Sequence, residues 1–306
     1  MEYTVDEEAE RCCLKAGKIS AKIAELIRKI VKPNMAALEI AEKVESEIEN
    51  LGAMPAFPVT VSCDETAAHF SPLWQDKTVA TGLVKIDFGI SVNGYASDNA
   101  ISFDLTENQR YEVMIKASET ALDNAIKFIK NSFSNSREVL LKDIGRQIQD
   151  AITLAGFSPV RNLSGHEIRQ YEMHAGITIP NYDNGNNAKL SDGIYAIEPF
   201  ATSGIGIVQD GNPSGIYQLE KAKPARDAST REILKFIQQE YKTMPFSVRW
   251  IVKKFGLRAV LSLKALEQTG CLHQFNQLVE KSRMPVSQSE KTILIKNNKV
   301  LVLGEN

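Results

Sequence analysis

The sequence lacks the features that mark secreted disulfide-rich proteins and membrane proteins. Its 306 residues include only four cysteines, Cys12, Cys13, Cys63 and Cys271, with no C-x-x-C pair and no regular spacing. This usage argues against a disulfide framework and indicates reduced, mostly buried thiols. No apolar run approaches the roughly 20 residues of a membrane span, and the acidic start of the chain leads into a helical pattern. We therefore expect a cytoplasmic protein with no membrane association.

An excess of positive charge is also missing. Lysine and arginine total 36 against 38 acidic residues, for a net charge of −2. A nearly neutral chain gives no electrostatic reason to expect binding to nucleic acid or to an anionic membrane. Apolar residues at 43% and charged residues at 24% are ordinary globular values. The length allows one large domain or two of ordinary size.

The first hundred residues predict two helices followed by strands. Apolar residues at helical spacing run from Ile19 to Ile30, before Pro33, and again from Ile40 to Leu51, where Gly52 offers a C-terminal cap. Alternating apolar residues then predict a strand that leads into Asp87.

An Asn93-Gly94 pair predicts a two-residue hairpin turn after that strand. The turn fixes the register, so Asp87 lies opposite Ala100 and Asp98 lies opposite Gly89. The two aspartates are then diagonal neighbours on one face of the sheet, about 7–8 Å apart at the backbone. Like-charge repulsion disfavours this arrangement unless cations bind there.

The same order of elements is predicted a second time. A capping box from Thr106 to Gln109 predicts one helix start, and an apolar repeat from Ile144 to Ile152 predicts a second helix. Strands that carry His166, His174 and Glu198 follow. Two helices followed by strands therefore occur twice, which favours a structural duplication whose halves meet at one site.

Residues 224–273 interrupt this pattern with short helices and predict an inserted helical subdomain. A capping box from Ser229 to Glu232 predicts the start of its first helix. Its basic residues, which include Lys242, Arg249, Lys253 and Lys254, could contact ribosomal RNA, but a solvated helix face explains them more simply. The run from Thr292 to Leu303 returns to strand and brings Glu290 back to the sheet.

Five side chains with metal-binding chemistry stand in short motifs along the chain: Asp87, Asp98, His166, Glu198 and Glu290. Four carboxylates and one imidazole suit two divalent ions about 3.5 Å apart, because carboxylates can bridge two cations. Taken singly, each acid could be an ordinary polar residue. The histidines could be core imidazoles, although glycines beside His166 and His174 fit backbone that bends around a site.

These motifs resemble those of methionine aminopeptidases, most of all the type II enzymes of archaea and eukaryotes. The resemblance spans nearly the whole chain. It is carried by the following stretches: Ala56-Phe57-Pro58, Ala67-Ala68-His69-Phe70-Ser71-Pro72, the aspartate hairpin, Leu163-Ser164-Gly165-His166, His174-Ala175-Gly176, Ile197-Glu198-Pro199-Phe200 and Ser287-Gln288-Ser289-Glu290. One departure is Lys291, where these enzymes often have histidine, which could alter the surroundings of Glu290.

The resemblance implies an α/β fold of the duplicated pita-bread type. Residues 1–306 would form a single catalytic domain, with 224–273 as the inserted helical subdomain. It also implies two divalent metal ions, which could be Co, Mn, Fe or Zn. By analogy Asp87 would chelate one ion, Asp98 and Glu290 would bridge both, and His166 with Glu198 would complete the other shell.

The resemblance further implies removal of N-terminal methionine from nascent polypeptides whose second residue is small. An ion-activated water would attack the first peptide bond, and Glu198 would pass a proton to the leaving amine. His174 would stabilise the carbonyl oxygen, and His69 would bond the scissile amide or the next residue. Phe57 and Met173 would line the methionine pocket, although plain core packing explains both nearly as well.

The expected enzyme is a cytoplasmic monomer, and a transient contact with the ribosome stays open. One alternative is an Xaa-Pro peptidase, which usually has an extra N-terminal domain and lacks the insert. Another is a catalytically inactive relative that binds the ribosome or RNA, but such proteins have typically lost metal ligands.

Overall fold

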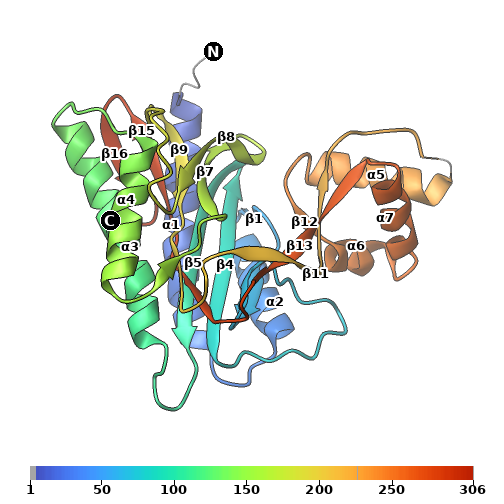
Figure 1. The fold of residues 1–306 in the computed structure, drawn as a ribbon. Coiled ribbons are helices and arrows are strands. Elements are labelled where there is room, and N and C mark those ends of the chain that lie inside the picture. Colours follow the sequence, from blue (N-terminus) through green and yellow to red (C-terminus); the bar gives the residue numbers. More distant parts are fainter. Residues whose placement is uncertain (1–4, 226, 306) are drawn as a thin grey trace.

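The computed structural model describes residues 5–225 and 227–305, and within them the chain forms seven helices and sixteen strands (Figure 1). The helices are α1 (Glu7–Ile30), α2 (Ala37–Asn50), α3 (Glu112–Ser134), α4 (Leu141–Leu154), α5 (Ala228–Glu240), α6 (Val248–Phe255) and α7 (Ala259–Gln268). The strands of the first half are β1 (Met54–Pro55), β2 (Thr60–Cys63), β3 (Thr66–Ala68), β4 (Leu83–Val92) and β5 (Tyr95–Asp104). Those that follow are β6 (Ser158–Pro159), β7 (Ser164–Arg169), β8 (Glu172–Pro180), β9 (Gly193–Ile197), β10 (Phe200–Thr202), β11 (Val208–Leu219), β12 (Phe246–Ser247), β13 (Leu272–Glu280), β14 (Val286–Gln288), β15 (Lys291–Lys296) and β16 (Lys299–Val302).

In the first half, α1 and α2 pack on the sheet built around β4. This strand pairs with β5 along its whole length and with β1 and β2 on its other edge. Because side chains alternate along a strand, β4 directs one set of apolar residues, Val84, Ile86, Phe88 and Ile90, into the core with the two helices. Asp87 lies on the opposite face of the sheet.

The register of the β4–β5 hairpin is as predicted. Val92 lies opposite Tyr95, Asp87 opposite Ala100 and Gly89 opposite Asp98. The Asn93-Gly94 turn has positive φ at both residues, as a tight two-residue turn requires. The two aspartates therefore share one sheet face.

The second half repeats the arrangement. Helices α3 and α4 cover a five-stranded sheet in the order β16-β15-β9-β7-β8. Figure 1 shows these two helices together on one side of the molecule, away from α2. The predicted repeat of two helices followed by strands is confirmed.

The halves join along the line where β5 meets the residues just before and within β15. Ala100 and Glu290 exchange backbone hydrogen bonds of 3.4 and 3.2 Å. The Asp98 amide donates to the Thr292 hydroxyl at 2.7 Å, and that hydroxyl donates to the Asp98 carbonyl at 3.0 Å. Residues almost 200 positions apart in the chain are thereby fixed side by side.

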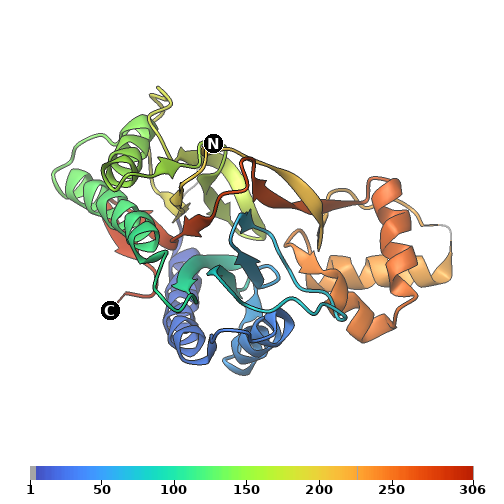
Figure 2. The same cartoon turned by 60° about the horizontal axis from the view of Figure 1, so that its bottom comes forward.

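In the sequence, helices α5, α6 and α7 follow β11 and precede β13. They form a lobe at one side of the molecule (Figures 1 and 2). The lobe has its own apolar cluster, which includes Ile237, Phe246, Ile251 and Leu263. We propose from this separate core that 224–273 is an inserted subdomain of one catalytic domain. Residues 1–4, 226 and 306 of the predicted 1–306 domain lie outside the described residues.

Both predicted helix starts are wrong, for one reason. Helix α3 begins at Glu112, because the Asp104 carboxylate accepts from the amides of Thr106 and Tyr111 and holds a loop ahead of the helix. Helix α5 begins at Ala228, where Asp227 accepts from the Thr230 amide at 2.8 Å. In both places an aspartate two residues upstream of the predicted N-cap accepts local backbone amides, so the hydrogen-bonding pattern differs from that of the predicted box.

Two predictions from composition can be compared with the structure. The four cysteines are all free, and three of them are buried, with Cys63 half-buried. Over the described part of the chain, no helix is both long enough and apolar enough to cross a membrane.

Candidate metal centre

A pocket of about 210 Å³ collects every site residue predicted from the sequence. Its lining includes the following nine side chains: Phe57, His69, Asp87, Asp98, His166, Met173, His174, Glu198 and Glu290. They come from β4 and β5 in the first half, from β7 and β8 in the second, and from the segments around them. The duplicated topology therefore brings residues from six separate stretches of sequence to one place.

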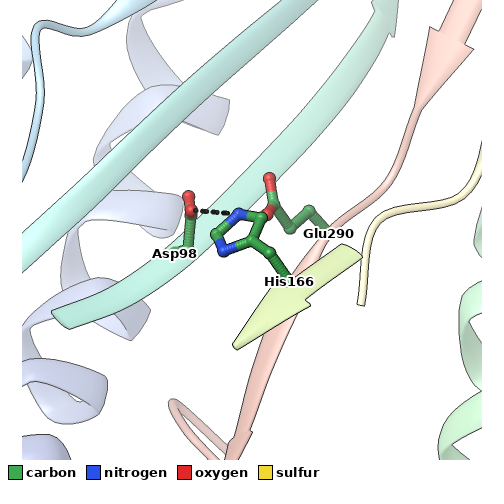
Figure 3. Close-up of side chains that lie close together, drawn as sticks. All are labelled: Asp98, His166 and Glu290. Carbon is green, nitrogen blue, oxygen red and sulfur yellow. Dashed lines mark ion pairs between the residues drawn. The ribbon is translucent and has the colours of Figure 1, made fainter. Parts of the chain in front are cut away.

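Three of these residues form the tightest group. One ligand atom each from Asp98, His166 and Glu290 lie within 4.8 Å of one another, and all three side chains are buried. Figure 3 shows their side chains converging from β5, β7 and the segment before β15. The His166 Nε2 atom lies 3.6 Å from Asp98 Oδ2 and 3.7 Å from Glu198 Oε1. That spacing leaves room for an ion between the nitrogen and the carboxylate oxygens.

Glu198 occupies a different position from the predicted one. The sequence placed it on a strand, but it lies in the short break between β9 and β10, beside Pro199. The Asn181 side chain holds this break in place, because its Nδ2 donates to the carbonyls of Leu163 at 3.0 Å and of Glu198 at 3.2 Å. The break turns the carboxylate into the pocket.

Burial and mutual repulsion strongly disfavour the charged forms of the four carboxylates. Burial, opposed by a hydrogen bond from Gln288, raises the pKa of Asp87 to about 7. Burial first, and then repulsion from the other acids, raises the pKa values of Asp98, Glu198 and Glu290 well above their usual range. Burial, aided by nearby His174, lowers the pKa of His166 to about 3, so the imidazole is neutral at pH 7 and can donate its lone pair to a metal.

The donor set fits divalent cations. Asp87 Oδ1 and Asp98 Oδ1 are buried and have no hydrogen-bond partner among the described residues. Buried carboxylate oxygens ordinarily have partners, and a cluster of four acids in one pocket is costly without positive charge. Hard oxygen ligands together with one neutral imidazole suit Mn, Fe, Co or Zn.

The two further histidines lie beside this cluster. The His69 Nδ1 atom is 3.1 Å from the Asn276 carbonyl, which can only accept, so Nδ1 carries the proton and Nε2 is left as an acceptor. The backbone of His69 has a positive φ of 65°, an uncommon conformation for histidine. The His174 ring packs edge-on against His166 with centroids 4.5 Å apart. The His174 side chain is accessible to solvent at the pocket surface. Desolvation by the surrounding protein atoms, together with the nearby His69, lowers its pKa to about 4.

Phe57 and Met173 supply apolar wall to the pocket. Met173 also belongs to a buried cluster, against which the half-buried Phe57 packs. The approach of Phe57 depends on Gly89, because a Cβ at that position would lie 2.4 Å from the phenylalanine ring. The two residues therefore do both things that the sequence suggested: they line the pocket and they pack against the core.

Gly165, next to His166, does not bend the backbone around the site as predicted. Gly165 lies in strand β7, and a Cβ there would lie 2.3 Å from the Ala196 carbonyl oxygen of β9. Its function is close strand packing. Lys291 also lies apart from the site, because its Nζ donates to Glu305 at 2.5 Å and its side chain is not among those that line the pocket.

Several residues in the pocket wall or directly behind it were not assigned a role from the sequence. Gln288 donates through Nε2 to Asp87 Oδ2 at 3.4 Å and to Glu290 Oε2 at 3.3 Å, so one amide holds two of the proposed ligands. Its neighbour Glu290 was the only signal for it in the sequence. The chain around the inserted lobe adds further wall residues, namely Ile216, Pro245, Phe275 and Leu278. Apolar residues of this kind give no signal in a single sequence.

Comparisons with known proteins agree with this geometry. Residues 11–250 match metallopeptidase family M24. A methionine aminopeptidase of Pyrococcus abyssi is 39% identical over 297 residues, which cover 95% of this chain and 98% of the relative. A solved thermophilic Arx1 structure superposes with a TM-score of 0.81 at 16% identity, covering 98% of this chain and 92% of that one. The solved methionine aminopeptidase of Thermotoga maritima gives a TM-score of 0.69 at 21% identity and full coverage of both chains.

Proposed function

The chain belongs to metallopeptidase family M24, and from that premise we propose that it is a methionine aminopeptidase. Its fold is the duplicated pita-bread α/β fold, and it depends on a divalent metal cofactor. The observation that carries the proposal is the pocket, where five proposed ligands and two neutral histidines meet beside an apolar wall. Its substrates would be the N-termini of nascent polypeptides in the cytoplasm, and it would act as a monomer.

We propose that the site holds two ions. Asp87 would hold one, His166 and Glu198 would hold the other, and Asp98 and Glu290 would bridge them. Ions of this kind, when bound, activate water and polarise the scissile carbonyl. Gln288 keeps Asp87 and Glu290 turned toward the same space, because its amide donates to both.

The remaining steps belong to the protein's own side chains. Burial raises the pKa of Glu198, so its carboxylate readily takes a proton from the attacking water and can deliver it to the leaving amine. The neutral His174 ring can donate an N–H to the carbonyl oxygen as negative charge develops there. His69 Nε2, an acceptor by its tautomer, can accept an N–H from the scissile amide or the next residue.

Selectivity for methionine follows from the pocket wall. The thioether side chain is long, unbranched and polarizable, and it suits the space bounded by Phe57 and Met173. The second residue of the substrate must pass close to His69, so a bulky side chain there would misplace the scissile carbonyl. A misplacement of about 1 Å can cost ~10²-fold in rate.

A set of peptides tests this function. With metal-loaded protein, Met-Ala-Ser, Met-Gly and Met-Pro peptides should lose methionine, Met-Leu and Met-Lys peptides should resist, and Leu-Pro peptides should stay intact. Released amino acids are measured by chromatography. Release of leucine from Leu-Pro as fast as methionine from Met-Ala-Ser would indicate an Xaa-Pro peptidase. No release from any peptide, in folded protein loaded with two metals, would leave the non-catalytic binding protein as the explanation.

A further inference from the structure

A buried ion pair connects the inserted lobe to the first half of the chain. Arg249, in α6, donates through both terminal nitrogens to the two carboxylate oxygens of Glu45, in α2, at 2.6 Å each. The exposed fractions of the two side chains are 5% and 7%. Two parallel hydrogen bonds of this length fix the relative orientation of the groups as well as their distance.

The pair also holds two other segments and the neighbouring residue of α6. Glu45 accepts from the Val59 amide at 3.1 Å and from the Trp250 indole at 2.9 Å. Arg249 donates through Nε to the Pro72 carbonyl at 3.0 Å. The Glu45 carboxylate thus accepts four hydrogen bonds, and each of the three guanidinium nitrogens of Arg249 donates to a defined acceptor.

These partners stand next to the pocket wall in sequence. Val59 lies between Phe57 and Thr60, which both line the pocket, and Pro72 lies three residues after His69. Arg249 lies four residues after Pro245, the wall residue that the lobe contributes. Neither Glu45 nor Arg249 lines the pocket itself. Their contacts therefore join three wall segments that come from separate parts of the chain.

The short strand β12 completes the connection. Its Ser247 lies opposite Ile216 of β11, another wall residue, and the Ser247 hydroxyl accepts from the Arg249 amide at 3.2 Å. The start of α6 is thus tied to β11 on one side and to Glu45 on the other. Pro245 lies just before this fixed point.

We propose that Glu45 and Arg249 are positioning residues that set the width of the pocket for the first side chain of the substrate. This inference rests on the proposed function. The pair fixes Phe57, His69 and Pro245 relative to one another, and it does not touch the metal ligands. Its loss should weaken binding of methionine and its discrimination from other side chains, and should leave the metal affinity unchanged.

A double variant, Glu45→Met with Arg249→Met, tests the proposal. Removing one partner alone would leave a buried unpaired charge, whereas apolar residues of similar length often preserve stability. In the metal-loaded double variant we expect KM for Met-Ala-Ser to rise roughly tenfold. The value of kcat should change by less than about threefold, because a looser wall mainly affects binding shared by ground and transition states. The preference for Met-Ala-Ser over Leu-Ala-Ser should narrow.

Binding of L-methionine, measured by calorimetry on metal-loaded protein, gives a readout that needs no turnover. We expect about tenfold weaker binding in the double variant. If the wild-type protein releases no methionine from peptides, the proposed function fails, and the calorimetric difference still decides the positioning role. Absence of methionine binding to the wild-type protein would overturn the positioning proposal, while release of methionine from peptides would still decide the proposed function.

Matched variants separate positioning from a general loss of stability. Lys296→Met with Glu10→Met removes another ion pair, of 2.7 Å, whose members do not line the pocket, and it should leave KM and methionine binding unchanged. If the first double variant does not fold, Trp250→Phe removes one donor to Glu45 and should weaken methionine binding about threefold. Unchanged KM, selectivity and methionine binding in the folded Glu45→Met, Arg249→Met variant, or in folded Trp250→Phe, would overturn the proposal. The pair would then only stabilise the lobe.

Discussion

The central pocket and the helical lobe use burial in opposite ways. In the lobe, burial covers apolar side chains such as Ile237 and Leu263, and it stabilises the fold directly. In the pocket, burial covers four carboxylates that repel one another, and it disfavours their charged forms. The comparison indicates that the pocket is held together by the surrounding fold and by a cation, while the lobe is held together by its own core. Substitutions in the two regions should therefore separate activity from stability.

The largest effect is expected at Asp98, the carboxylate closest to His166. Asp98→Ala removes a proposed bridging ligand, so turnover of Met-Ala-Ser should fall by more than about 10³-fold and at least one ion should be lost. The metal-free variant should unfold at a temperature equal to or above that of the metal-free wild type, because like-charge repulsion is relieved. Elemental analysis, kinetics and calorimetry measure the three quantities. Near-normal turnover would remove Asp98 from the ligand set.

The next largest effect concerns His69 and His174, which lie beside the proposed metal ligands. His69→Ala and His174→Ala should each lower kcat by about 10²-fold, the scale of one lost acid or oxyanion donor. Both variants should keep the full metal content, because neither ring is a proposed ligand. Loss of metal in either variant would make that histidine a ligand.

The lobe should show the reverse pattern. Leu263 is fully buried in α7, and Leu263→Ala should lower the free energy of unfolding by about 2–5 kcal/mol, while kcat in the folded protein stays within a small factor of wild type. Leu261, on the same helix, is 71% exposed, and Leu261→Ala is the matched control with an expected change within about 0.5 kcal/mol. Denaturant titration measures both. Equal destabilisation by the two variants would show that the lobe lacks the core described here.

The smallest effect is a dependence of metal-free stability on pH. The folded protein holds protons on the site carboxylates, because burial raises the pKa of Asp87 to about 7 and the other three further above their usual range. Their stabilising effect is complete below about pH 4 and is lost as the pH rises through the folded pKa values. The neutral His166 and His174 act in the opposite direction, but only below their unfolded pKa of about 6.5.

Between about pH 6.5 and pH 7.5, therefore, the carboxylates dominate this slope. Buried Lys85, whose pKa is lowered to about 8, acts in the opposite direction mainly above that range. The midpoint of thermal unfolding of the chelated protein should fall over this range, and saturating metal should reduce the fall. At this chain size, 1 kcal/mol corresponds to about 2–4 °C. A midpoint that rises with pH in chelator would contradict the assigned protonation of the pocket.

The parts of the site that local rules govern could be predicted from the sequence. The Asn93-Gly94 turn determines the whole register of β4 and β5, so the positions of Asp87 and Asp98 followed from two residues. Helices α1, α2 and α4 could also be predicted, because their apolar residues recur at helical spacing within a short stretch of sequence. The starts of α3 and α5 were not predicted correctly, because Asp104 and Asp227 accept nearby backbone amides, and a pattern alone does not rank alternative caps.

The contacts made between distant segments could not be predicted. Gln288 meets Asp87 only because β14 is brought beside the first sheet, more than 200 residues away in sequence. The Glu45–Arg249 pair likewise depends on how the lobe is placed against α2. A glutamine and a buried ion pair have no distinctive local pattern, since their role comes from their partners.

Metal-dependent turnover tests the central claim most directly. Protein treated with chelator should contain no metal by elemental analysis and should release no methionine from Met-Ala-Ser, since the described site offers carboxylates and imidazoles but no other activated nucleophile. Adding Mn or Co should restore release, with full activity at two ions per chain. Full turnover in excess chelator, with no metal found in the protein, would contradict the account.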